Sequence, residues 1–331
     1  MVSEWQDSAV AATGRALASV GWDFTTARSR RGHFACVTTY PGDRRASLAI
    51  WLTAFEPPAA GEPLPAMLRA RVPARWRCEI AAARPGAILA WWHRVGVFAA
   101  LDPRRLAGSE RTSCVLTRTQ VVADGYVNAF AAGPGPAGGV LAFVPGILPH
   151  YLRDREELHD IATSPEMSAA LNRSVSRARW PLDDAPCLAG CLERSAVLRI
   201  FMAVRAWGFR ERVLTAYSGR CAVCAELRAD VSVARIVPAD APWSSTETCN
   251  GMALCPTHHR AYDRALITVD PEYRVVLSEG RFAELTEADL AGGADGFQER
   301  LRAVIVLPPE HTLRPRPEFL HAGSVLRGWA P

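Results

Sequence analysis

The spacing of apolar residues predicts three helices in this chain. Between residues 3 and 21, Trp5 and Leu17 fall near the same face of a helix whose other side is largely polar. Helical periodicity returns at 194–217, and residues 149–161 are also predicted to be helical. These three helices lie in the first and middle thirds of the chain.

Short apolar runs bounded by turn residues predict β-hairpins. The runs at 34–40 and 46–52 flank a Pro-Gly-Asp turn, and those at 266–269 and 274–277 flank a second turn. Two apolar segments fit a strand as well as a helix, because apolar content alone does not separate them: 68–77 and 88–100. The remaining expected elements are strands at 139–144 and 301–307, a turn at 133–139, a proline-rich loop at 57–65 and a short helix within 280–296.

A polar, proline-bearing stretch at 164–192 divides these elements into two groups. We expect a first domain at 1–163 with mixed helices and strands, a linker at 164–192 and a second domain at 193–331. A chain of 331 residues is long enough for two cores. The fold class predicted from this order is α+β.

Composition describes an ordinary globular protein and excludes several classes. Hydrophobic residues make up 49% and charged residues 22%, and no apolar run reaches the length of a membrane span. The N-terminus lacks a signal-peptide pattern, so no membrane partner is expected. The cysteine number is nine, which is odd, and several cysteines have metal-ligand spacing. These features indicate a protein of the reducing cytoplasm, in which cysteines stay reduced, rather than a protein held together by disulfides.

Basic residues are all arginine, and they cluster. The net charge is only +4, but arginines greatly outnumber acids between Arg69 and Arg118 and between Arg194 and Arg235. Arginine binds phosphate oxygens with two parallel hydrogen bonds, so these segments suit a polyanion, although a solvated face explains them equally well. The candidate DNA-binding residues are Arg104, Arg105 and Arg111 in one loop, Arg210 and Arg212 on the helix predicted at 194–217, and Arg260.

Two pairs of potential metal ligands lie close together in the second domain. Cys221 and Cys224 are separated by two residues, and Cys255 and His258 repeat that spacing. Two intervening residues allow both ligands of a pair to reach one tetrahedral ion. The alternative, buried thiols beside an incidental histidine, does not account for two matched pairs. The sequence therefore predicts a structural Zn²⁺ site.

The stretch around these ligands resembles the zinc-stapled branch of the HNH, or ββα-metal, endonuclease family. The residues that carry the resemblance are Cys221 and Cys224, Ala-Arg-Ile-Val-Pro at 234–238, and Asn-Gly-Met-Ala-Leu-Cys-Pro-Thr-His-His-Arg-Ala-Tyr-Asp at 250–263. The match covers about sixty residues. It departs from the family pattern at one position, where Arg235 replaces a histidine. The resemblance implies a C-terminal ββα-metal module with a structural zinc.

The resemblance also implies a role for each residue of the site. It places Arg235 at the general-base position, Asn250 in the loop between strand and helix, and His259 on a catalytic Mg²⁺ or Mn²⁺. Arginine stays protonated in proteins, so Arg235 cannot accept a proton from water. It can still bind a phosphate.

Three functions are compatible with these features. The first is a DNA-binding protein whose HNH-like domain, related to restriction of modified or foreign DNA, has weakened or lost hydrolysis. The second is an active metal-dependent DNA endonuclease that uses a non-standard base, and the third is a zinc-stabilised interaction module. The expected partner is double-stranded DNA, and the sequence leaves a homodimer open.

Overall fold

The structure, a computed structural model, describes residues 4–28, 34–40, 43–56, 65–73, 86–106, 113–135, 138–176, 195–239, 241 and 244–329. The chain divides into two compact units, Met1–Trp207 and Gly208–Pro331. Each unit has a separate hydrophobic core. No helix in the described ranges is long and apolar enough to cross a membrane.

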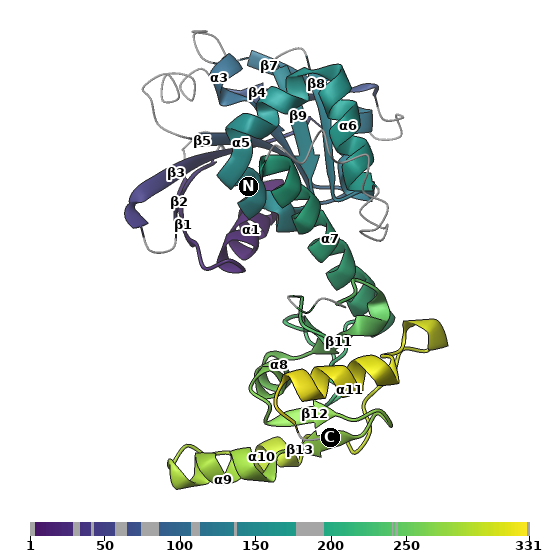
Figure 1. Cartoon of the computed structure of the whole chain (residues 1–331). Coiled ribbons are helices and arrows are strands. Elements are labelled where there is room, and N and C mark those ends of the chain that lie inside the picture. Colours follow the sequence, from purple (N-terminus) through teal and green to yellow (C-terminus); the bar gives the residue numbers. More distant parts are fainter. Residues whose placement is uncertain are drawn as a thin grey trace. The chain divides into compact units, whose positions relative to one another are not determined.

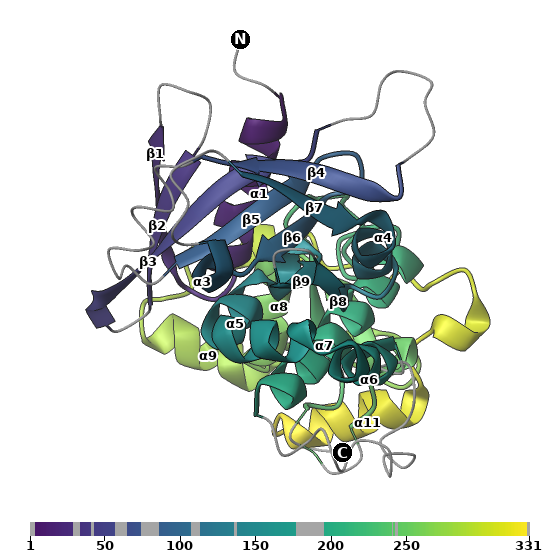
Figure 2. The ribbon, with the colours of Figure 1, turned by 90° about the horizontal axis from the view of Figure 1, so that it is seen from above.

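The first unit is built on a seven-stranded sheet with the order β1-β2-β3-β5-β6-β9-β8 (Figures 1 and 2). Its strands are β1 (Asp23–Arg28), β2 (Phe34–Tyr40), β3 (Asp43–Ala54), β5 (Gly86–Trp92), β6 (Val97–Leu101), β8 (Phe130–Gly135) and β9 (Gly138–Phe143). Only β3 and β5 pair in parallel, and the other neighbours are antiparallel. A separate antiparallel pair is formed by β4 (Met67–Val72) and β7 (Ser113–Arg118).

Several helices of the first unit pack against strands β8 and β9 (Figures 1 and 2). The helices of the unit are α1 (Glu4–Ala18), α3 (Pro103–Leu106), α4 (Thr119–Val127), α5 (Leu148–Thr163), α6 (Pro165–Ser176) and the first part of α7 (Ser195–Ala216). Helix α4 contacts mainly β8 and β9, α5 mainly β9 and α6 mainly β8, whereas α1 contacts β1, β3 and β5. Strands β5 and β6 are fully buried, as expected of the centre of such a sheet.

Most elements predicted from apolar spacing are present, and the α+β prediction is confirmed. The undecided segment 88–100 contains two antiparallel strands joined at a turn, because β5 ends at Trp92 and β6 begins at Val97. The prediction of a strand at 301–307 is wrong. In that range the structure has a single bridge between Arg274 and Val304.

The first part of the linker expected at 164–192 is a helix in the structure. Residues 165–176 form α6, which packs on β8 through buried side chains such as Leu171 and Val175. The boundary between the compact units falls inside α7, between Trp207 and Gly208. Residues 177–194 lie outside the described residues, as do Arg111 and all but the last residue of the loop expected at 57–65.

The second unit consists of two small hairpins and short helices. In chain order these are the end of α7, β10 (Ser232–Arg235), β11 (Gly251–Leu254), α8 (Pro256–Asp263), β12 (Ile267–Val269), β13 (Val275–Leu277), α9 (Glu279–Glu287), α10 (Ala294–Gln298) and α11 (Pro317–Leu326). Strands β10 and β11 are antiparallel, and so are β12 and β13. In Figure 1, α11 lies alongside β12, with which it is in contact.

Candidate metal centre and active site

Cys221, Cys224, Cys255 and His258 meet at one point of the second unit. Their ligand atoms all lie within 4.8 Å of one another. The Nδ1 atom of His258 is 3.5 Å from the sulfur of Cys221 and 3.2 Å from that of Cys255. A tetrahedral zinc ion with bonds of about 2.0–2.3 Å requires ligand atoms about 3.3–3.8 Å apart. The spacing and chemistry of this cluster therefore suit Zn²⁺.

Two local features bring the ligands together. Cys221 and Cys224 belong to a turn that follows α7. A 2.8 Å hydrogen bond from the Ala222 N–H to the Ala253 carbonyl connects this turn to β11. Cys255 is the N-cap of α8, so His258 lies in the first turn of that helix, directly above it. The cluster thus joins the end of α7, β11 and α8.

The electrostatics of the cluster favour a divalent cation. Burial raises the pKa of the Cys224 and Cys255 thiols, to about 12 for Cys224, and the neighbouring Cys221 sulfur adds to this effect. Burial also opposes ionisation of Cys221, but hydrogen bonds from His258 and from backbone N–H groups lower its pKa to about 6. A cation among the sulfurs is what allows all three to ionise together.

The β10–β11 hairpin is held closely against α7. Arg235 pairs with Gly251 across the hairpin. A Cβ atom at Gly251 would lie 2.5 Å from Val213 Cγ2 and 2.8 Å from Phe209 Cζ, so no larger residue fits there without displacement. The approach of α7 to the hairpin explains the glycine of the Asn-Gly pair.

Asn250 fastens the segment between β10 and β11. Its side chain is fully buried and accepts a 2.8 Å hydrogen bond from the Val237 N–H. Its amide group donates to the Val237 carbonyl at 3.2 Å and to the Ser245 carbonyl at 2.8 Å. One side chain therefore satisfies three backbone groups of the loop.

Asn250→Ala is expected to destabilise the second unit by about 2–4 kcal/mol, because it leaves buried backbone groups without partners. Hydrogen exchange should rise around residues 236–250 while the first unit is unchanged. Asn172→Ala is the matched control, since Asn172 bridges the N–H and carbonyl of Ala132 in the first unit, both at 2.7 Å. An Asn250→Ala protein with parental exchange in the second unit would contradict this account of the loop.

His259 has a polar neighbour at each ring nitrogen. Its Nδ1 is 2.5 Å from the Ser232 hydroxyl, and its Nε2 is 3.5 Å from the Asp263 carboxylate. The Ser232 hydroxyl donates to the Leu254 carbonyl at 3.4 Å, which leaves its oxygen to accept the proton of Nδ1. In that tautomer the Nε2 lone pair faces the carboxylate of Asp263. An imidazole nitrogen facing a carboxylate is a pair of ligand types that suits a divalent cation.

Asp263 and Ser232 were not among the predicted site residues. The signal for Asp263 is present in the sequence, because His259 and Asp263 are four residues apart and so share a helix face. Ser232 gives no such signal, since its contact depends on how β10 lies against α8.

Arg235 lies on the other face of β10 from Ser232. Side chains alternate along a strand, so Ser232 and Ala234 share one face while Arg235 points to the opposite one. The Arg235 guanidinium lies over the Phe209 ring of α7, 4.6 Å from its centroid. Its backbone carbonyl accepts a 2.7 Å hydrogen bond from Arg327. The position is therefore fixed from both α7 and the C-terminal helix.

The arginines predicted to bind DNA differ in their surroundings. Arg104 donates two 3.0 Å hydrogen bonds to the buried carboxylate of Asp102 and a 2.7 Å bond to Asp160. Burial opposes ionisation of Asp102, but hydrogen bonds from Arg104, together with the electrostatic influence of His159 and Arg104, lower the Asp102 pKa. Arg105 also lies 3.7 Å from Asp102. Arg104 thus links α3 to α5, and its DNA contact stays a prediction.

In the second unit, predicted DNA-binding arginines are more accessible. Arg260 is exposed on α8. Arg210 forms an exposed 3.1 Å ion pair with Glu211, and Arg212 donates to the Thr246 carbonyl at 2.8 Å. Exposed pairs of this kind contribute little stability and can exchange for a phosphate.

A comparison with known protein families finds a match over the residues that contain the metal cluster. Residues 221–270 match the family model described as HNH endonuclease. No curated protein matches the chain. A solved structure of a modification-dependent TagI restriction endonuclease matches 82% of this chain and 78% of that chain, with 10% identity and a TM-score of 0.29. That score is too low to support an argument from overall fold, so the family match carries the assignment. Residues 221–270 of this chain form a module of the HNH endonuclease family.

Proposed function

We propose that this protein binds double-stranded DNA and that its HNH module hydrolyses phosphodiesters weakly or not at all. The proposal rests on Arg235, to which the resemblance to the HNH family, supported by the match at 221–270, assigns the general-base position. A guanidinium remains protonated at any pH at which the protein is folded, so it cannot take a proton from water. A guanidinium is nevertheless a group that recognises phosphate.

The rest of the site supports binding and metal retention. We propose that the Cys221, Cys224, Cys255 and His258 cluster holds a structural Zn²⁺, and that His259 and Asp263 hold Mg²⁺ or Mn²⁺. Such a cation stabilises charge on phosphate oxygens and makes nearby water more acidic. In-line displacement places the entering and leaving oxygens on opposite sides of phosphorus. Arg235 and His259 lie on opposite faces of β10, so the proposal requires the two side chains to reach the same phosphate from these two sides.

A second candidate is an active endonuclease with a non-standard base. The facing pair of His259 and Asp263 favours it, because this chain has two potential cation ligands although Arg235 cannot act as a base. General-base catalysis contributes about 10²–10⁴-fold in rate, so its loss slows cleavage without abolishing the remaining contributions. The expected activity under this candidate is slow nicking of plasmid DNA.

A salt series tests the DNA-binding proposal. Binding of a labelled duplex should weaken as salt rises, with a slope of log affinity against log salt of about 0.9 for each phosphate contact. Equal affinity for plain and cytosine-modified duplexes would indicate backbone contacts alone. Tighter binding of modified DNA would support the role in restriction that the family resemblance implies. No binding at low salt would favour the zinc-stabilised interaction module instead.

A further inference from the structure

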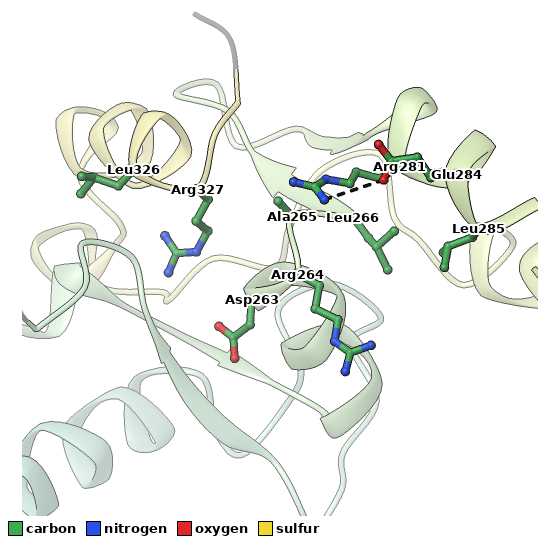
Figure 3. A pocket seen from close by; sticks show the side chains of 9 residues that line it. All are labelled: Asp263, Arg264, Ala265, Leu266, Arg281, Glu284, Leu285, Leu326 and Arg327. Atoms are coloured by element: carbon green, nitrogen blue, oxygen red, sulfur yellow. Dashed lines mark ion pairs between the residues drawn. The ribbon is translucent and has the colours of Figure 1, made fainter. Parts of the chain in front are cut away.

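A cleft of about 560 Å³ lies in the second unit beside Asp263. It is bounded by the end of α8, by α9 and by the end of α11, and Figure 3 shows its lining side chains. Three arginines line it, Arg264, Arg281 and Arg327, together with the carboxylates of Asp263 and Glu284. The remaining lining is apolar and consists of three leucines and an alanine. This combination of cations and apolar surface indicates an anionic ligand with an apolar part.

The three arginines are not equivalent. Arg327 donates to the carbonyls of Ile236 and Gly323 at 2.6 and 3.0 Å and to that of Arg235 at 2.7 Å. Its guanidinium also lies 4.2 Å from the centroid of the Tyr262 ring. Arg327 therefore forms a fixed wall of the cleft and contributes its charge without being available for new bidentate contacts.

Arg264 and Arg281 are available to a ligand. Arg264 is exposed at the C-cap of α8, and within the described residues its guanidinium has no hydrogen bond or ion pair. Arg281 makes a single ion pair, 3.8 Å from Glu284, in which both side chains are more than half exposed (53% and 69%). An exposed pair at this distance is weak and exchanges readily for another anion.

The cleft adjoins the candidate cation site. Asp263 belongs to both, since its carboxylate lies 3.5 Å from His259 Nε2. A cation held there offsets the charge of Asp263. The cleft then presents three guanidinium groups against the single carboxylate of Glu284.

We propose that this cleft binds the phosphodiester backbone of the DNA strand next to the phosphate that faces the cation site. Arg264 and Arg281 donate to phosphate oxygens, and the leucines contact deoxyribose. A single phosphate would leave most of the cleft empty, and the exposed Leu326 (46%) suits a sugar better than an ion. The inference rests on the proposed DNA binding and names where the second unit holds the strand.

Glutamine variants at Arg264 and Arg281 test the proposal. Fluorescence anisotropy of a labelled duplex in Mn²⁺ is measured over a range of salt for the parent protein, each single variant and the double variant. Each single variant should lose about one unit of salt slope and bind about tenfold more weakly at low salt. The control is Arg302→Gln, an exposed arginine of the same unit outside this cleft, which should bind within about twofold of the parent.

The outcomes separate this inference from the function on which it rests. A parent protein that binds no duplex removes the proposed function itself. A parent that binds, with Arg264→Gln and Arg281→Gln indistinguishable from Arg302→Gln, overturns the cleft alone. Oligoglutamate is tested as a competitor. If it displaces the duplex from the parent at equal charge concentration and the variants abolish that competition, the cleft is a site for acidic peptides and the phosphodiester assignment is wrong.

Discussion

Replacing Cys255 by serine is expected to abolish zinc binding and to unfold the second unit. Structural zinc sites contribute about 10–16 kcal/mol of apparent binding free energy, whereas a whole domain is stable by about 5–15 kcal/mol. The cluster joins α7, β11 and α8, so its loss affects the entire core of the unit. Metal analysis should find one zinc per parental chain and none in the variant. Hydrogen exchange should show loss of protection after residue 208.

Cys249→Ser is the matched control for this experiment. Cys249 is buried in the same unit but lies outside the cluster and donates only weakly to Glu247, at 3.5 Å. This variant should retain one zinc and parental protection. Chelation of the parent should reproduce the Cys255→Ser result, and more easily at low pH, because each thiol must lose its proton to bind the metal. A well-folded parent with far less than one equivalent of metal would contradict the proposed zinc site.

Arg235→His is expected to raise plasmid cleavage by about 10²–10⁴-fold, the usual contribution of a general base. Histidine titrates near neutral pH, so the variant should become more active as pH rises through the pKa of the new imidazole. The measurement is the initial rate of nicking in Mn²⁺. The gain should disappear when His259→Ala is added, because the cation site would then be lost.

Arg235→His could raise cleavage by adding a base or by removing the arginine. Arg235→Gln separates these two effects. Glutamine removes the positive charge, and with it the contact over Phe209, but supplies no base. Its nicking rate should stay near that of the parent. If glutamine raises cleavage as much as histidine does, the arginine inhibits through its charge or size. The explanation by loss of a base would then be wrong.

The features best predicted from sequence are those with local causes. Two ligand pairs with matched spacing predict the metal cluster, because two intervening residues restrict how far apart the ligands of a pair can lie. The hairpin of β12 and β13 follows from a turn between short apolar runs. The helix α7 follows from its periodicity.

Other features depend on tertiary contacts and left no local signal. Strand β8 ends in Gly-Pro-Gly, a composition that predicts a turn, but it lies at the sheet edge, where Pro134 can be accommodated. Helix α6 lies in a polar stretch and is stabilised by its packing on β8. Arg104 was predicted to bind phosphate, yet its partners are Asp102 and, from α5, Asp160. Charge clustering in sequence does not reveal which arginines are already paired.

The most direct test is to measure binding and cleavage in the same sample. The unaltered protein is incubated with a labelled duplex and Mn²⁺, and anisotropy and strand length are followed together. The account predicts that the duplex becomes bound and stays intact, or is nicked only slowly. Rapid cutting that persists in His259→Ala, or failure to bind the duplex at low salt, would contradict it.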